Sequence, residues 1–486
     1  MMMMKISRGD PAGGGNSQTK AAIGRKTDHM KQSLNRFRAC FPALLLMIAL
    51  AWPQITAAQS FRIIRDAEIE KLIDDYSRPL LKAANLAPDS VGLNIVGDPN
   101  LNAFVTNGQN IFIHTGLILE AEEPNMVIGV IAHEIGHITG GHLARGDEAI
   151  SSTYRPAVIA TILGLGSILA GAGDIGMALI TGGQQIANRS FLTYSRGQEA
   201  AADNTALQLL EATGQSAEGI IGMMDTLANQ EILSERRRDP YAQSHPMSRD
   251  RVKAYQNSAR SSPFKDARDP EALIFRHKMV QAKIYGFLDS PRTTLRRYSK
   301  QKSQPARYAR AIAYFRQGSR NLALRELDSL IAEMPDNPWL HELKGQIYYE
   351  TGLAEAGIEP YRKAIALAPD EALLLTGLAS CQIGKAARGG AEAKKYNEEA
   401  IKNLRKAVRL DRQGGTAYFQ MSKAYGQLGQ TAFAQWALAE YYAAVGSPEA
   451  RQHAKRAIKG LSKGSVEYIR ATDILSSIKE SKRKRQ

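Results

Sequence analysis

The chain has 486 residues, of which 44% are hydrophobic and 23% charged, and its formal net charge is +15 at pH 7. This length exceeds what a single hydrophobic core supports, which excludes a one-domain protein and predicts two or three domains. Cys40 and Cys381 are the two cysteines. They exclude a disulfide-rich scaffold, so the fold must rely on packing and on metal binding.

Residues 1–58 are typical of an extension followed by a secretory signal. From Met30 the sequence has a basic start, an apolar run over Ala39–Trp52 and small residues up to Ala58. This order predicts cleavage after Ala58 and export of the rest. The polar residues before Met30 indicate either an upstream extension or a true start at Met30 instead of Met1. An uncleaved membrane anchor is the alternative, although the apolar run is shorter than the usual span of about 20 residues.

The segment after the signal predicts a helix, a strand and a hairpin. Phe61–Ala84 has helical periodicity, and Val91–Val96 is typical of a strand. Ala103–Ile113 predicts a hairpin that turns at Asn107-Gly108. We expect an exposed sheet edge around Ile111–Thr115, which either pairs with an extended substrate backbone or is an ordinary structural strand.

Residues 131–142 read IAHEIGHITGGH and carry the clearest chemical signal. Residues four apart lie on one face of a helix, so His133 and His137 point the same way. The apolar residues around them predict a buried helix, in which neutral imidazoles are good zinc ligands. Glu134 projects one residue further round, which suits a carboxylate that takes a proton from metal-bound water, as in the HExxH pattern. Two surface histidines on an ordinary helix are the alternative.

His142 is a third histidine in this stretch, but its spacing differs from the extended pattern HExxHxxGxxH. Leu143 occupies the position of the last histidine in that pattern. We therefore expect His142 either to support one of the metal ligands or to lie at the surface.

A further ligand must come from elsewhere, and residues 194–214, YSRGQEAAADNTALQLLEATG, offer the best candidate. Their alanines and leucines predict a helix that places Glu199 and Asp203 one turn apart on one face. Glu199 could complete the zinc site while Asp203 orients an imidazole through its other nitrogen. Taken alone, these carboxylates would also suit the start of any helix.

HEIGH followed further along the chain by ExxxD resembles the gluzincin peptidases related to HtpX and the CaaX prenyl proteases. The resemblance implies a zinc metalloendopeptidase with one zinc ion per chain. It implies His133, His137 and Glu199 as the metal ligands, Glu134 as the catalytic base and Asp203 as their support.

Ser244 to Arg251, SHPMSRDR, resembles a second element of that family, in which SHP is followed by an arginine. The resemblance implies that His245 and Arg251 line the site. It leaves His245 two roles, either steadying the developing oxyanion or capping the zinc in a closed state. From the residues alone, a histidine before Pro246 indicates only an extended turn.

Residues 156–183 lie between the two halves of the proposed site and are apolar and glycine-rich, with Asp174 as their one charged residue. A single membrane crossing would separate His137 from Glu199, so we exclude it if both bind one ion. Two crossings would need about forty apolar residues. We therefore expect a helical hairpin that either packs on the catalytic helices or touches lipid or a barrel protein.

The C-terminal half contains a repeat. Tyr314 and Tyr348 are 34 residues apart, and so are Gly318 and Gly352. A 34-residue period with tyrosine and glycine at these phases is typical of tetratricopeptide repeats, although a generic helical bundle is the alternative. We expect four repeats over about residues 304–448, the third widened by residues 385–393, and Cys381 as a small buried residue between their helices. Such a solenoid offers a concave face for extended peptides or partner proteins.

The last segment, residues 451–486, is rich in lysine and arginine and ends SKRKRQ. A solvated end is the expected structure, and contact with anionic lipid or lipopolysaccharide is the alternative. An exported chain does not meet nucleic acid, so we expect no nucleic-acid partner.

These predictions combine into a mainly α fold: a gluzincin-type α+β metallopeptidase domain with a small β-sheet, followed by an α-helical tetratricopeptide-repeat solenoid. The expected segments are the extension and signal (1–58), the peptidase domain with its apolar hairpin (59–270), a helical linker (271–303), the repeats (304–450) and a basic tail (451–486).

The order of signal, peptidase motifs and repeats resembles periplasmic proteases that act in outer-membrane protein assembly. This resemblance implies a periplasmic location, unfolded or misassembled outer-membrane proteins as substrates, and contact with the barrel-assembly machinery and the membrane surface. Two alternatives stay open. One is a chaperone or scaffold that acts mainly through its repeats, and the other is a quality-control peptidase anchored in the inner membrane.

Overall fold

The computed structural model describes residues 62–106, 109–142, 196–230, 245, 249–411 and 414–483. Three predictions lie outside these residues: the extension and signal over 1–58, the apolar hairpin over 156–183 and the turn at 107–108. Among the described helices, none is both long and apolar enough to cross a membrane.

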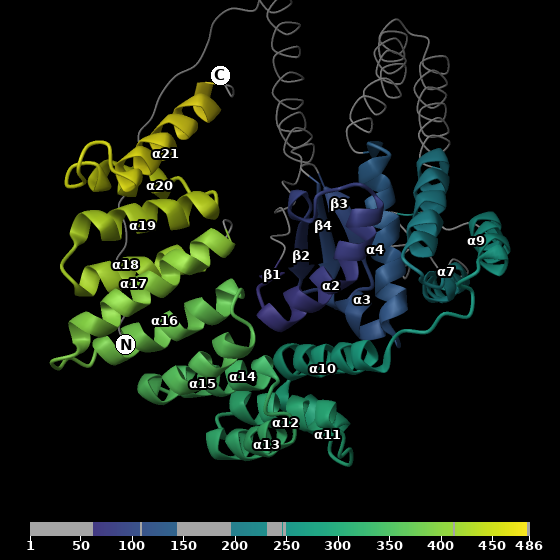
Figure 1. Ribbon diagram of the computed structural model, residues 1–486, viewed down its shortest axis with the longest axis horizontal. Helices are drawn as coiled ribbons and strands as arrows, with labels where there is room; N and C mark the ends of the chain where they lie inside the picture. Colours follow the sequence, from purple (N-terminus) through teal and green to yellow (C-terminus); the bar gives the residue numbers. More distant parts are fainter. Residues whose placement is uncertain are drawn as a thin grey trace, which may run out of the picture. The chain divides into compact units, whose positions relative to one another are not determined.

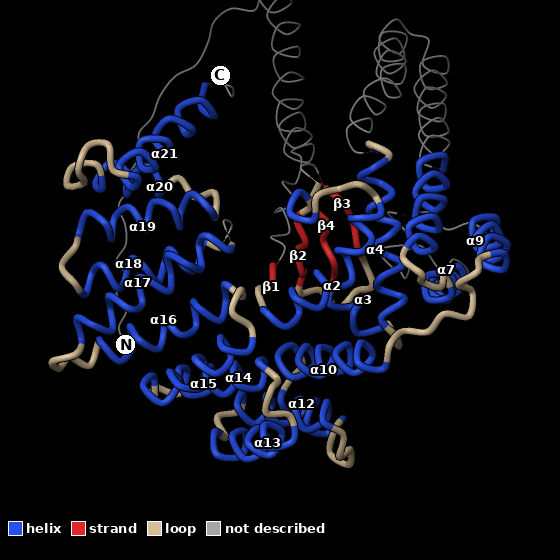
Figure 2. The backbone as a smooth tube through the Cα atoms, in the orientation of Figure 1, coloured by secondary structure: helices blue, strands red, loops and turns tan. Residues whose placement is uncertain are grey.

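The first elements form a small mixed sheet with helices packed beside it (Figures 1 and 2). In chain order the elements are β1 (Ile63–Ile64), α2 (Ala67–Ala83), the 3-10 turn η1 (Pro88–Ser90), β2 (Gly92–Val96), β3 (Ala103–Thr106), β4 (Asn110–His114), α3 (Thr115–Glu120) and α4 (Pro124–Thr139). The sheet order is β1-β2-β4-β3, with β2 parallel to β4 and the outer pairs antiparallel. The predicted helix, strand and hairpin are confirmed.

Of the two alternatives for residues 111–115, the ordinary structural strand is confirmed and the exposed sheet edge is wrong. β4, which we expected to be an edge, lies between β2 and β3 and is bonded on both sides, so the outer strands are β1 and β3. The side chains of Ile111 and Ile113 are fully buried. The parallel pairing of β2 with β4 is a non-local contact that the pattern of one hairpin does not reveal.

α2 covers the sheet because its apolar residues recur with helical spacing. Asp66 caps the helix by accepting a hydrogen bond from the backbone N–H of Ile69 at 3.0 Å. The buried face consists of Ile69, Leu72, Ile73, Tyr76, Leu80 and Leu81. It belongs to the same core as the sheet and α4, so this core holds α4 in place.

Further helices complete the first half of the described chain. Residues 196–212 are helical, and after them come α7 (Glu218–Gln230), α9 (Arg249–Ser261), α10 (Glu271–Leu288) and α11 (Pro291–Arg297).

Four helix pairs follow, as the repeat period predicts (Figure 1). They are α12 (Gln304–Arg316) with α13 (Arg320–Glu333), α14 (Pro338–Glu350) with α15 (Ala354–Leu367), α16 (Ala372–Ala386) with α17 (Ala393–Leu410), and α18 (Gly415–Gln427) with α19 (Thr431–Ala444). The phase glycines Gly318 and Gly352 have φ of +85° and +82° at the turns inside their pairs, which explains glycine at this phase. Cys381 is fully buried, as expected.

The prediction of a solvated tail is wrong as far as the structure describes it. After α19 come α20 (Glu449–Ala457) and α21 (Val466–Arg483), whose small residues Ala450, Ala454 and Ala471 are fully buried in the core of the last repeat. The basic side chains occupy the other faces of these helices, and their number concealed the helical spacing of the alanines.

α10 contacts both the sheet-containing part and the repeats. Nδ1 of its His277 and the hydroxyl group of Tyr76 on α2 form a hydrogen bond of 3.0 Å. Gln281 of the same helix donates a hydrogen bond to the backbone carbonyl of Ala121 at 2.7 Å. On the same helix Lys283, which is only 2% exposed, approaches three carboxylates.

The ion pairs of Lys283 connect α10 with the start of α2 and with α14 in a buried network. Its Nζ lies 2.8 Å from Asp66 and 3.2 Å from Glu68 at the start of α2, and 3.3 Å from Glu342 of α14. Tyr308 of α12 donates to Glu68 at 2.9 Å. Burial lowers the pKa of Lys283, but the nearby carboxylates more than offset this and hold the pKa well above its ordinary value. The lysine is therefore charged and paired.

We predict that Lys283→Met lowers the free energy of unfolding by about 3–5 kcal/mol, because buried carboxylates lose their counter-charge. Urea unfolding followed by circular dichroism measures this change. Lys344→Met is the matched control, since Lys344 pairs at 2.6 Å with Asp328, whose side chain is 54% exposed. Its change should stay below about 1 kcal/mol. Equal changes in the two variants would contradict the assigned role of the network.

Candidate metal centre

α4 carries the motif HEIGH into the core. The helix starts with Pro124, and Asp269 accepts a hydrogen bond from the backbone N–H of Asn125 at 2.7 Å in the first turn. His133 and Glu134 are fully buried, while the side chain of His137 is 12% exposed. The helix thus presents two imidazoles and one carboxylate inside the protein, with His137 closest to solvent.

Gly136 explains how a second helix comes close to this motif. A Cβ atom on Gly136 would lie 2.7 Å from the carbonyl oxygen and 2.9 Å from the Cα of Ala202. Only glycine therefore permits this approach of the helix over residues 196–212. The contact brings Glu199, one turn before Ala202, to the two histidines.

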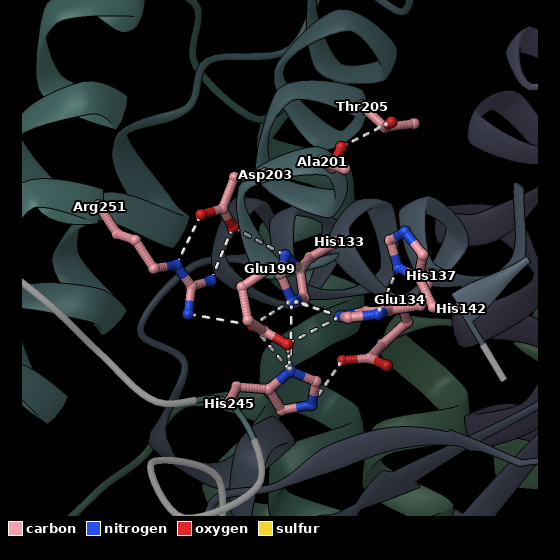
Figure 3. Close-up of polar contacts among 10 residues, drawn as sticks. All are labelled: His133, Glu134, His137, His142, Glu199, Ala201, Asp203, Thr205, His245 and Arg251. Carbon is pink, nitrogen blue, oxygen red and sulfur yellow. Dashed lines mark hydrogen bonds and ion pairs between the residues drawn. The ribbon is translucent and has the colours of Figure 1, made fainter. Parts of the chain in front are cut away.

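Four side chains meet at this point (Figure 3). The Nε2 atoms of His133 and His137 are 3.1 Å apart. The Glu199 carboxylate lies 3.5 Å from Nε2 of His133 and 3.4 Å from Nε2 of His137. Nδ1 of His245 lies 3.2 Å from both oxygens of Glu199 and 3.4 Å from Nε2 of His133. One atom from each residue falls within 4.8 Å of all the others, so this group could hold a metal ion.

Asp203 and Arg251 support the group from behind. Nδ1 of His133 lies 3.0 Å from Asp203, on the side of the ring away from Glu199. Arg251 of α9 donates to both oxygens of Asp203, at 2.6 and 2.7 Å, and its Nη1 lies 3.0 Å from Glu199. A bidentate arginine fixes a carboxylate in both position and plane.

Glu134 is placed beside the group rather than inside it. Its carboxylate accepts no hydrogen bond from the described residues, and Nε2 of His245 lies 3.5 Å from it. Burial raises the pKa of Glu134 above its ordinary value. A buried carboxylate with unused lone pairs and a raised pKa suits proton transfer.

The electrostatics of the group favour a positive charge at its centre. Burial lowers the pKa of His133, but Asp203 and Glu199 more than offset this and raise it to about 9. Burial and the neighbouring His133 lower the pKa of His137 to about 2. Burial raises the pKa of Glu199, yet hydrogen bonds with His133 and His245 hold it below its ordinary value. An ionised carboxylate among crowded imidazoles suits a divalent cation.

The sequence missed three residues of this arrangement. Gly136 looked like an ordinary position of the motif, and Gln198 contacts the backbone of His142. Tyr255 of α9 is 1% exposed, and burial together with the charge of Asp203 raises its pKa. Its spacing of one turn after Arg251 was the available signal. His142, expected either to support a ligand or to lie at the surface, places its Nδ1 3.0 Å from Nδ1 of His137.

Comparisons with known protein families match two parts of the chain, the part that contains the group of metal-binding side chains and the part that contains the repeats. Residues 64–259 match the family described as Peptidase family M48, and residues 340–371 match a tetratricopeptide repeat. The chain is therefore similar to Peptidase family M48 over residues 64–259 and to tetratricopeptide repeats over residues 340–371.

Curated proteins to which the chain is similar carry names that describe proteases. The chain is 25% identical to the "Beta-barrel assembly-enhancing protease" of Yersinia pestis over 66% of each chain, and 24% identical to the protein of that name in Escherichia coli K12 over 62% of each. It is 27% identical to "Metalloprotease LoiP" of Escherichia coli K12 over 40% of this chain and 83% of that protein. The chain thus spans just under two thirds of the first two relatives.

We predict that Gly136→Ala weakens binding of a divalent metal ion and lowers the free energy of unfolding by about 1–3 kcal/mol, because the new methyl group forces the two helices apart. Isothermal titration with metal and urea unfolding measure the two effects. Gly426→Ala is the control, since a Cβ on this helical glycine of α18 meets nothing within 4 Å. An unchanged metal affinity in Gly136→Ala would show that the close approach is not needed.

Proposed function

We propose that this protein is a zinc-dependent endopeptidase in which His133, His137 and Glu199 bind one zinc ion. The observation that carries the proposal is the meeting of these side chains from two distant helices, with Glu134 beside them. Asp203 orients His133 through its second nitrogen, and Arg251 holds Asp203 in place.

The distances support zinc as the ion. Zinc in proteins is tetrahedral with ligand bonds of about 2.0–2.2 Å, which places neighbouring ligand atoms about 3.3–3.5 Å apart. The Nε2 atoms of His133 and His137 lie 3.1 Å apart, and the Glu199 carboxylate lies 3.4–3.5 Å from each of them. Two imidazoles and a carboxylate also form one of the ligand sets that catalytic zinc sites use.

The chemistry then follows from the residues. Zinc bound there supplies a Lewis acid that polarises a peptide carbonyl and lowers the pKa of water. Glu134 accepts the proton of the attacking water on its carboxylate and later donates it to the leaving amine. Burial raises the pKa of Glu134 above its ordinary value, which strengthens this carboxylate as a base.

His245 caps the site in this proposal. Its Nδ1 lies at the same distances from Glu199 and His133 as a fourth ligand would, and its Nε2 lies 3.5 Å from Glu134. The ring therefore occupies the position where a substrate carbonyl or water must enter. Of the two roles that the sequence left open, the geometry supports capping.

The wider function rests on the names of the relatives and on the order of the segments. We propose a peptidase domain over residues 59–270, a helical linker over 271–303 and repeats over 304–450. The signal-like composition before residue 59 supports a periplasmic location. The names that refer to β-barrel assembly support misassembled outer-membrane proteins as substrates and the barrel-assembly machinery as a partner. The repeats would select or deliver these polypeptides.

A chaperone that acts mainly through its repeats is the second candidate. The four helix pairs favour it, because such arrays bind partners and perform no chemistry. An inner-membrane-anchored peptidase is the third. The N-terminal sequence of the exported protein tests the anchor, since a start near Gln59 excludes it.

We predict that Glu134→Gln retains zinc and loses cleavage of an unfolded model protein by about 10²–10⁴-fold, the usual contribution of a positioned acid or base. Metal content and cleavage rate are measured on the same preparation. Glu211→Gln is the control, because Glu211 is an exposed residue of the helix over residues 196–212. If Glu134→Gln still restores a defect in outer-membrane assembly, the chaperone function is favoured. If it still cleaves, the assignment of Glu134 is wrong.

We predict that His245→Ala raises the cleavage rate of the same substrate, because removing the cap opens the fourth position while the remaining ligands stay. The rate and the bound zinc are compared with the wild type. Asp203→Ala serves for comparison, since it should reduce cleavage by about 10–100-fold through loss of support. A fall in the rate of His245→Ala with zinc retained would favour the oxyanion role instead.

A further inference from the structure

The turn after α4 folds His142 back onto the motif. α4 ends at Thr139, and the next residue in the left-handed region is Gly141, with φ of +62°. A Cβ on Gly140 would lie 2.4 Å from Nε2 of His142. Glycine at position 140 therefore leaves room for the His142 ring, and glycine at position 141 suits the left-handed backbone conformation. The two glycines together allow the chain to turn so that the side chain of His142 lies against the motif.

His142 touches both helices of the metal centre. Its Nδ1 lies 3.0 Å from Nδ1 of His137, and the two rings meet edge to face with centroids 5.0 Å apart (Figure 3). Its backbone carbonyl accepts a hydrogen bond from Gln198, the neighbour of Glu199, at 3.3 Å. The residue thus links the end of the first helix to the start of the second.

The chemistry of the contact fixes which nitrogen carries the proton. Nε2 of His137 faces Glu199, so a metal would bind there and the proton of the ring must lie on Nδ1. With a metal on Nε2, the Nδ1–H of His137 would donate to Nδ1 of His142, which lies 3.0 Å away. His133 has the same arrangement, except that its second nitrogen faces the Asp203 carboxylate.

We propose that His142 is a positioning residue for the metal centre, which accepts a hydrogen bond from His137 and so fixes the tautomer and orientation of that ligand. The inference rests on the proposed zinc site. Its two histidine ligands have different supports, since a carboxylate faces Nδ1 of His133 and an imidazole faces Nδ1 of His137. His142 lies one residue before the last ligand position of the motif HExxHxxGxxH. In this proposal it does not bind the metal but supports His137, which does.

The test compares zinc affinity in full-length variants, measured by competition with a chelator. His142→Ala should bind zinc about 10-fold more weakly than the wild type, within the range that supporting residues contribute. His142→Asn should stay close to the wild type, because Oδ1 of asparagine can take the place of Nδ1 as acceptor. The cobalt-substituted proteins give a second readout, in which His142→Ala but not His142→Asn should change the visible absorption bands.

His453→Ala is the matched control, since Nδ1 of His453 also has a side-chain partner, Gln435 at 2.8 Å, but lies on α20. Its zinc affinity should equal that of the wild type. The thermal midpoint of the metal-free proteins separates a loss of affinity from a loss of folding. Equal affinity and equal cobalt spectra for His142→Ala and wild type would overturn the inference, and so would equal losses in the alanine and asparagine variants. A wild-type protein that binds no zinc would overturn the proposed function itself.

Discussion

The close contact of two helix backbones at Gly136 and Ala202 is the constraint on which the metal centre depends. Packed helices usually lie 8–10 Å apart, depending on the side chains at their contact, and glycine at position 136 allows a close approach. The glycine removes the one Cβ that stands between them. The core that holds α4 also includes Ala206 and Leu209 of the helix over residues 196–212. Burial of this apolar surface therefore stabilises the close contact between the two helices.

That contact concentrates charge in a place with little water, and the surrounding residues balance it. Glu199 and Asp203 are both 6% exposed or less, and a single guanidinium, Arg251, pairs with both. Without Arg251 the two carboxylates would repel one another one turn apart. With it, Asp203 holds the outer nitrogen of His133 while Glu199 faces the inner one. The arrangement explains why the motif ExxxD needs an arginine from a third helix.

Local helix geometry predicted part of how the site's side chains are arranged, whereas contacts between distant segments could not be predicted. Spacing of four places His133 and His137 on one face in any helix, so this pair follows from local geometry alone. The sheet edge failed because the parallel pairing of β4 is non-local, and the tail failed because basic residues masked a stripe of buried alanines. The contact of His142 with His137 depends on the left-handed backbone conformation of Gly141, which cannot be predicted from the sequence alone.

The buried charges around Lys283 bear on how the repeats relate to the chemistry. The lysine lies on α10, its carboxylates lie on α2 and α14, and Tyr308 of α12 joins the same network. A rotation of the first two repeats against α2 would separate charges that have no access to water, at a cost of several kcal/mol. α2 also packs on the core that holds α4. The buried network and the shared core therefore connect the first repeats to the helix that carries the HEIGH motif.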